Sequence, residues 1–225
     1  MSAHAAAPPP FRVDAAGMRE AATRARDYPG EVLLRTHRLV LRGLRFRDLS
    51  ALSALHREES VRALLLEPVP RTALEIAGLV ILANRTAEQH PGLGVWHASN
   101  HAQRFVGLFS LMPLADGRGV ELGARLLPWA AGRLYSLEGS RALRDHAFTT
   151  LGLECLHGFC DPGNHAVPAL FHRLGFEARG QTIHFDRPAL GFVLERAAWQ
   201  RRPARPQRSF HDECTALARS CLPDR

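Results

Sequence analysis

The spacing of hydrophobic residues predicts a run of strands in the middle of the chain. Strand-like runs cover 94–99, 104–112 and 120–126, and turn residues around Asn100 and Asp116 separate them. In the third run, Val120, Leu122, Ala124 and Leu126 lie on one face and alternate with Glu121, Gly123 and Arg125. A period of two is typical of a strand that buries one face. We therefore expect three consecutive strands joined by tight turns.

Other segments place apolar residues three and four positions apart, which predicts amphipathic helices. The expected helices cover 15–27, a stretch that begins at Asp48 and includes Leu49, Leu52 and Leu55, 76–83 with an end near His90, 134–151 and 167–174. Pro168 in the first turn and Gly175 just past the end delimit the last helix. Gly152 is expected to end the helix before it.

Short strands and one hairpin complete the predicted order of elements. The strands cover 38–44 and 155–160, and the hairpin arms cover 181–185 and 191–194 around Asp186-Arg187-Pro188. This mixed α/β order predicts a single domain over 31–200. Residues 1–30 form an N-terminal extension with a disordered start and one helix, and residues 201–225 form a C-terminal tail.

Length and composition fit one globular domain. The chain has 225 residues, of which 46% are hydrophobic, and this is enough for a proper core. No apolar run approaches the roughly 18 residues that a membrane span needs. The first residues lack the charged-then-apolar pattern of a signal peptide, and the four cysteines match no zinc spacing. We expect a cytoplasmic protein with reduced thiols, without a metal and without a membrane partner.

All 29 basic residues are arginines, and the formal net charge is +7. The tail 201–225 carries six arginines against three acidic residues. Such a tail can contact phosphate or an acidic surface. A solvated linker is the preferred interpretation, because no aromatic residue is interleaved with the arginines of 201–208. A nucleic-acid partner is therefore left open but unsupported.

A strand that leads into a glycine turn and then a helix is the first functional clue. Residues 120–126 are followed by Gly132 and by the helix predicted from Leu134. The amides of a helix's first turn have no partner within the helix, and the helix dipole adds partial positive charge. We therefore expect a pyrophosphate-bearing ligand at this turn.

Residues from position 36 to position 199 follow a familiar order. They are Thr36 to Arg42, Asp48, Gly94-Val95-Trp96, Val106-Gly107, Val120 to Gly123, Gly132-Arg133 with Tyr135 and Glu138, Asp161 to Asn164, Leu174-Gly175-Phe176, Leu194 and Trp199. Together they resemble the GNAT N-acyltransferase superfamily and, within it, the branch of ribosomal-protein N-terminal acetyltransferases. No single motif is specific, but their order and spacing together are.

The resemblance implies a fold and an activity. The fold is a mostly antiparallel, twisted central sheet that is splayed between its fourth and fifth strands and flanked by helices. The activity is acetyl-CoA-dependent N-acetyltransfer to a primary amine: a protein N-terminus, an aminoacyl group or a small amine. In such enzymes the neutral amine attacks the thioester directly. A homodimer is left open.

The resemblance also implies site residues. Leu126 and Leu127 would bind the pantetheine arm through their backbone, and Asn164 would bind it from the next loop. The residues implied at the cofactor turn are Gly132, Arg133, Leu134, Tyr135, Ser136 and Leu137. Phe171 would contact the cofactor at a position where some relatives carry a tyrosine, but it cannot protonate the departing thiolate.

Glu121 is the candidate base, acting through a water. It lies on the face of its strand opposite the apolar set. The alternative is an ordinary strand carboxylate paired with an arginine such as Arg125. Glu138 is expected to interact with the dipole of the helix that follows the turn.

Two departures from the family pattern support a second hypothesis. Leu134 stands where a glycine lets the pyrophosphate approach the backbone, and Phe171 stands where some relatives have the tyrosine. Trp129 also departs from the family's arginine or glutamine. The alternative is therefore a non-catalytic GNAT-fold module that binds protein or RNA through an arginine-rich surface. Cofactor binding discriminates between the two hypotheses.

Overall fold

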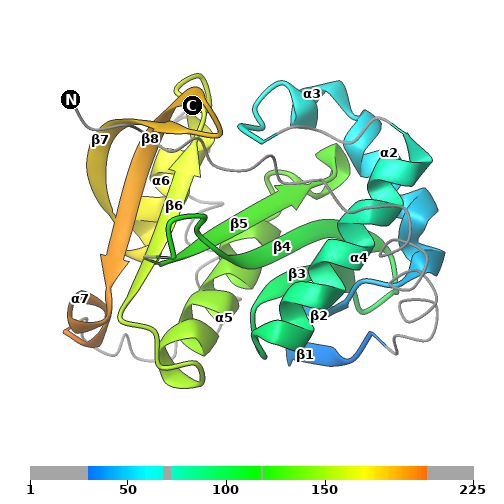
Figure 1. The fold of residues 1–225 in the computed structure, drawn as a ribbon, viewed down its shortest axis with the longest axis horizontal. Coiled ribbons are helices and arrows are strands. Elements are labelled where there is room, and N and C mark those ends of the chain that lie inside the picture. The colour runs from blue at the N-terminus through cyan, green and yellow to red at the C-terminus, as the bar shows by residue number, and fades with distance from the viewer. Residues whose placement is uncertain (1–29, 68–71, 118, 202–225) are drawn as a thin grey trace, which may run out of the picture.

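The computed structural model describes residues 30–67, 72–117 and 119–201, which form one mixed α/β domain (Figure 1). The strands are β1 Val32–Arg35, β2 Leu39–Gly43, β3 Gly94–Asn100, β4 Phe105–Pro113, β5 Val120–Leu126, β6 Cys155–Cys160, β7 Glu177–His184 and β8 Arg187–Glu195. The helices are α2 Leu49–Arg57, α3 Glu59–Arg62, α4 Ala73–Gln89, α5 Tyr135–Thr149, α6 Ala166–Leu174 and α7 Arg196–Gln200, with 3₁₀ turns η1 Phe46–Asp48 and η2 Pro128–Ala130.

The eight strands form one sheet in the order β1-β2-β3-β4-β5-β6-β8-β7. Every neighbouring pair is antiparallel except β5 and β6. Those two strands run parallel and pair only through Val120 with Leu156 and Glu121 with His157. Beyond Glu121 they diverge, and Figure 1 shows β5 leaning away from β6. The predicted splay between the fourth and fifth strands is thus confirmed, between β5 and β6 in the numbering that includes β1.

Helices cover both faces of the sheet, and the alternation along β4 separates two cores. Phe109 belongs to a cluster with α5, α6 and the C-terminal strands, whereas its neighbour Leu108 packs with α2 and α4. Gly139 of α5 allows a close approach, because a Cβ there would lie 2.4 Å from the ring of Phe109. The fifteen-residue helix α5 is thereby held directly against the strands that carry the site.

Local sequence explains several boundaries. Thr72 and Glu75 cap α4 reciprocally, since each side chain accepts a hydrogen bond from the other residue's amide. Gly175 ends α6 at φ +95°. Asp48 precedes α2 as expected, but its side chain does not cap that helix. It accepts instead from Arg42 at 2.7 and 2.8 Å and from the Arg45 amide at 2.9 Å.

Several predicted boundaries were wrong, and one strand was missed. The helix expected over 134–151 is shorter, since Leu134 is its N-cap and Thr150 rather than Gly152 is its C-cap. The C-terminal hairpin turns at Phe185-Asp186, and the arms are longer than expected. Strand β1 was missed, because its four residues show no alternation and depend on pairing with β2.

The helix expected at 15–27, the disordered start and most of the basic tail lie outside the described residues. Within the described part of the chain, no helix combines the length and the apolar character required to cross a membrane.

Candidate functional site

The turn before α5 presents unpartnered backbone amides. Leu134, the N-cap, is in the left-handed conformation at φ +60°, and no side chain caps the helix. The amide of Glu138 is the first to bond back, to the Leu134 carbonyl at 3.0 Å. The amides of Tyr135, Ser136 and Leu137 have no acceptor among the described residues. These three donors at a helix N-terminus match an oxyanion such as a phosphate.

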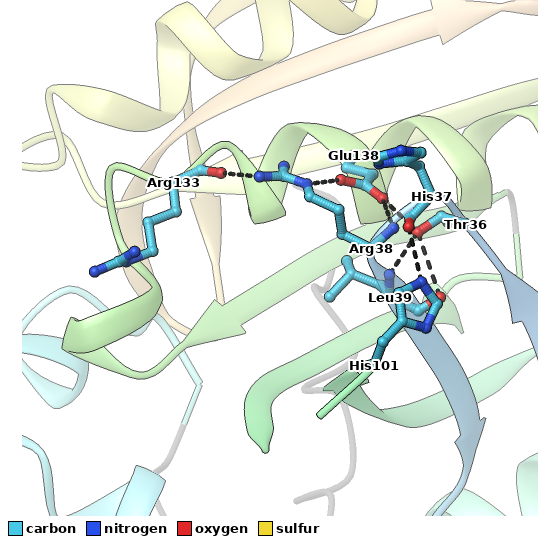
Figure 2. Close-up of polar contacts among 7 residues, drawn as sticks. All are labelled: Thr36, His37, Arg38, Leu39, His101, Arg133 and Glu138. Atoms are coloured by element: carbon cyan, nitrogen blue, oxygen red, sulfur yellow. Dashed lines mark hydrogen bonds and ion pairs between the residues drawn. The ribbon is translucent and has the colours of Figure 1, made fainter. Parts of the chain in front are cut away.

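Glu138 fixes this helix end to the β1–β2 turn, as Figure 2 shows. Its side chain is about 5% exposed. It accepts hydrogen bonds from the Thr36 hydroxyl at 2.6 Å and from the amide and Nε of Arg38 at 2.7 Å each. Arg38 also donates to the Arg133 carbonyl at 2.9 Å. Glu138 therefore does more than interact with the dipole, because it anchors the turn through Arg38.

Arginine side chains surround the turn. Arg133 is exposed, and its Nε donates to the Trp129 carbonyl at 2.9 Å. The guanidinium of Arg104, from the β3–β4 turn, stacks 3.7 Å from the centre of the Trp129 ring. Trp129 thus replaces the family's arginine or glutamine but holds an arginine beside the turn. The positive charge suits a polyphosphate ligand.

The backbone groups of β5 alternate between its two neighbours. The Leu127 amide donates to the Val106 carbonyl at 2.9 Å, and its carbonyl accepts from the Ala130 amide. Because Leu127 bonds toward β4, the backbone groups of Ala124 and Leu126 point to the other side, where β6 has diverged. Leu126 therefore has the orientation that a pantetheine contact needs. Leu127 does not, since its amide is already used.

Glu121 lies at the point where β5 and β6 separate. Its carboxylate contacts Nε2 of His184 at 3.0 Å, and the two side chains are 23% and 15% exposed. Arg125, the alternative partner, pairs instead with Glu67 in the segment after α3. The ordinary pairing of Glu121 with Arg125 was thus the wrong alternative. Sequence reasoning missed His184, which is 63 residues away.

A charged cluster lies on the α2–α3 side of β5. Burial lowers the pKa of Arg125 to about 10, so it stays protonated at neutral pH and pairs with Glu67. His56 of α2 is 2% exposed, and neither ring nitrogen has a hydrogen-bond partner in the described part of the chain. Burial, assisted by the charge of Arg125, lowers the pKa of His56 to about 4, so this imidazole is neutral at pH 7.

The tip of the β7–β8 hairpin meets the α3 segment across the opening between β5 and β6. Arg187 donates to the Leu65 carbonyl at 2.6 Å and to the Asp161 carboxylate at 3.3 Å. Figure 1 shows the hairpin end and the α3 loop approaching each other above the diverging strands. No local pattern predicts this contact, since Arg187 and Leu65 are 122 residues apart.

The remaining predicted residues lie near the C-terminal end of β6. Asn164 is half-buried in the β6–α6 loop, and its side chain has no hydrogen bond within the described ranges. Phe171 is 5% exposed and packs on Phe176 and Phe192. Its ring also fills the space beside Gly158. Phe171 therefore packs in the core and leaves little surface for a ligand.

Comparison with known proteins agrees with this geometry. Residues 38–177 match the acetyltransferase (GNAT) domain, whereas no curated protein matches the chain. A GNAT-family acetyltransferase from Bacillus anthracis is 17% identical, with a TM-score of 0.61 over 73% of this chain and 98% of that one. An acetyltransferase from Agrobacterium tumefaciens is 25% identical, with a TM-score of 0.58 over 72% of this chain and 93% of that one.

A third structure is the spermidine N-acetyltransferase from Vibrio cholerae in complex with CoA and spermine. It is 17% identical, with a TM-score of 0.62 over 73% of this chain and 99% of that one. The domain match spans β2 to β6, the amide-bearing turn and the splay described above. The chain belongs to the GNAT acetyltransferase family.

Proposed function

We propose that this protein transfers the acetyl group of acetyl-CoA to a primary amine by direct attack. The observation that carries the proposal is the set of three unpartnered amides at residues 135–137, next to a strand whose backbone opens toward the gap beyond Glu121. The amides suit the pyrophosphate, with Arg133 beside them, and the backbone of Leu126 suits the pantetheine arm. The half-buried Asn164 suits the same arm from the β6–α6 loop.

The chemistry requires a neutral amine. Alkyl amines have pKa values of about 10, so most molecules arrive protonated at pH 7 and a base must remove the proton. Glu121 lies where the strands part and is the carboxylate on which this proton removal depends. The thioester supplies the activated acetyl group. Backbone donors that polarise its carbonyl stabilise the negative charge that develops there.

The described cysteines favour direct attack over an acyl-cysteine intermediate. Burial raises the pKa of the Cys160 thiol to about 11, and Asp161 adds to the effect. Burial likewise raises the pKa of Cys155. A nucleophilic cysteine needs the opposite shift, because the thiolate is the reactive form.

The charges around the opening favour a cationic acceptor. Three carboxylates and two arginines flank it: Glu67, Glu121, Asp161, Arg125 and Arg187. The structural neighbour from Vibrio cholerae is described with spermine, and the sequence resembles acetyltransferases of ribosomal-protein N-termini. We therefore propose a primary amine on a small polyamine or on a peptide N-terminus.

The second candidate is a non-catalytic module, which Leu134 in place of the turn glycine and Phe171 in place of the tyrosine would favour. Two experiments separate the candidates. Acetyl-CoA at about 100 times its Kd should stabilise the fold by about 2.7 kcal/mol in a thermal-shift measurement. A panel of spermidine, spermine, short peptides and a simple alkylamine should then release CoA thiol above an amine-free control. Stabilisation without thiol release from any amine contradicts the catalytic proposal.

A further inference from the structure

The tip of the β7–β8 hairpin inserts one histidine into the site. Seven of the eight residues of β7 are exposed, and His184 at its end is not. Nε2 of His184 lies 3.0 Å from Oε2 of Glu121, which comes from the middle of the sheet. An exposed edge strand thus ends in a side chain that is 15% exposed and paired with a carboxylate at the strand splay.

Two aromatic rings hold the imidazole of His184 in place. Phe159 of β6 stacks on it with centroids 4.0 Å apart and an interplanar angle of 14°. Phe185 covers it at 4.4 Å and 59°. Phe185 and Asp186 both have positive φ values, +50° and +57°, so the tip is a tight turn built from residues that rarely adopt this conformation. The hairpin is also tied down by Arg187.

The second ring nitrogen of His184, Nδ1, is available to a ligand. Nδ1 of His184 makes no hydrogen bond to any described residue, and it is not among the buried unpartnered atoms. It therefore has access to a ligand or to solvent. A carboxylate that accepts a hydrogen bond from Nε2–H favours the tautomer whose Nδ1 carries a lone pair. This is the arrangement of an oriented imidazole base.

We infer that His184 is the catalytic base of this acetyltransferase, taking the amine's proton at Nδ1, and that Glu121 is the positioning residue that holds its ring. The inference rests on the proposed function. Nδ1 takes one proton from the protonated amine, and the neutral nitrogen then attacks the acetyl carbonyl carbon, forms the C–N bond and gives its next proton to solvent. The C–S bond breaks, and its electron pair leaves on sulfur. The imidazolium then returns the proton to solvent, from which the thiolate is protonated.

Other charged or titratable groups lie around the hairpin. Asp186 is in the turn, and Arg187 pairs with Asp161 of the β6–α6 loop. His157 of β6 is stacked on Phe159 at 6.5 Å and contacts the Cys155 sulfur. Glu121 is the one charged group among the described residues that directly contacts the His184 ring. His157 is therefore a matched control: it is a histidine near the same phenylalanine, without the carboxylate contact.

The test compares His184→Gln with His157→Gln on the amine that the wild type acetylates best. For H184Q, kcat should fall about 10²- to 10⁴-fold at pH 7, and this loss should shrink as the pH rises, since more of the acceptor amine is then already neutral. H157Q should keep the wild-type kcat within a few-fold and should keep the wild-type pH profile. Acetyl-CoA affinity and the thermal midpoint should be unchanged in H184Q. Wild-type kcat with the same pH profile in folded H184Q overturns the inference and leaves the proposed function standing.

A second measurement is independent of the acceptor. Long-range ¹H–¹⁵N NMR of the wild-type imidazoles, assigned with H184Q, should show neutral His184 protonated at Nε2 and bare at Nδ1. In Glu121→Gln this preference should weaken. A dominant Nδ1–H tautomer in the wild type contradicts the assigned role. If no amine is acetylated by the wild type, the proposed function fails, and the inference fails with it.

Discussion

The carbonyl of Leu134 accepts the hydrogen bond of the Glu138 amide at 3.0 Å, although Leu134 itself stands at φ +60°. A left-handed conformation costs a leucine about 1–2 kcal/mol, whereas glycine adopts it freely. The family's glycine at this position is thus explained by backbone conformation as well as by room for a phosphate. Here Arg38, which donates to the Arg133 carbonyl and to Glu138, stabilises the turn although a leucine occupies the left-handed position.

Leu134→Gly should therefore leave acetyl-CoA affinity unchanged or make it tighter. Relief of the left-handed leucine offsets the greater freedom of glycine in the unfolded chain, so the free energy of unfolding should change by less than about 1 kcal/mol. Calorimetric titration and urea unfolding measure the two effects. A tenfold loss of affinity would show that the Leu134 side chain is an adapted part of the site.

Gly132→Glu should abolish acetyl-CoA binding while the protein stays folded. Gly132 has φ +71°, and a Cβ there meets nothing within 4 Å, so a glutamate side chain has room. Its carboxylate stands beside the unpartnered amides and repels a pyrophosphate. The measurement is calorimetric titration with acetyl-CoA.

Gly117→Glu is the control for Gly132→Glu. Gly117 has φ +70° and equally open surroundings, but it lies in the β4–β5 turn. Both variants should show similar backbone strain, and only the first should lose the ligand. Equal affinity of folded G132E and G117E would remove the pyrophosphate from this turn.

Local sequence was sufficient for much of the fold. The strand over 120–126 was predicted with its observed ends, and so was the strand over 155–160, because each is delimited by turn residues. The splay followed from the family resemblance. The hairpin turn was placed too late, because Phe185 at φ +50° is not a residue that signals a turn.

The site was predicted less completely than the fold. The glycine turn, Leu126 and Glu121 are predicted from motif order, which is local, and as site residues they stay predictions. The partners of Glu121 and Arg125 could not be predicted from local sequence. His184 contacts Glu121 because of the order of the strands in the sheet, and Glu67 contacts Arg125 because of the path of the loop after α3. Leu127 was predicted to bind the pantetheine arm because the sequence does not reveal which alternate residues of β5 direct their backbone groups toward β4.

Acid should destabilise the protein through His56. Its pKa is lowered from 6.5 to about 4 in the folded state, so the unfolded chain binds a proton first as the pH falls. This contribution of His56 to the free energy of unfolding amounts to about 3 kcal/mol. It is fully present above pH 6.5 and is lost as the pH falls from 6.5 to about 4. Buried His97, whose pKa is also lowered to about 4, chiefly by burial, contributes in the same direction.

His56→Leu should therefore raise the free energy of unfolding at pH 5 and reduce its slope between pH 7 and 4. It also removes two unpartnered ring nitrogens, a further gain of about 1–3 kcal/mol each if the leucine packs well. Urea unfolding at several pH values measures both. An unchanged slope in folded H56L would refute the assignment.

Removal of residues 201–225 should leave acetyl-CoA affinity intact. The last described helix, α7, closes the domain through Trp199, whose Nε1 donates to Asp145 at 3.0 Å and whose ring stacks on Phe148 at 5.2 Å. A cut after residue 200 keeps these contacts, whereas a cut after Glu195 removes them and should lower the thermal midpoint. If the fragment cut after residue 200 no longer binds acetyl-CoA, the tail contributes to the binding site.

Glu121→Gln tests the carboxylate at the splay. The variant keeps the shape of the side chain and should keep acetyl-CoA affinity, because Glu121 is not among the residues proposed to bind the pyrophosphate or the pantetheine arm. Turnover should fall by up to about 10²- to 10⁴-fold, the usual contribution of a positioned acid–base group, because Glu121 orients the base His184. The loss should shrink as the pH rises, since more of the acceptor amine is then already neutral.

The double variant shows whether Glu121 and His184 act as one unit. If Glu121 works by holding the imidazole, E121Q combined with H184Q should be no slower than the slower single variant, because residues that act together lose activity non-additively. If the fold-loss of turnover in the double variant equals the product of the two single losses, the two side chains act separately. A folded E121Q enzyme with wild-type turnover from pH 6 to 9 would remove Glu121 from the reaction, and proton removal would then depend on solvent or on an amine that arrives neutral.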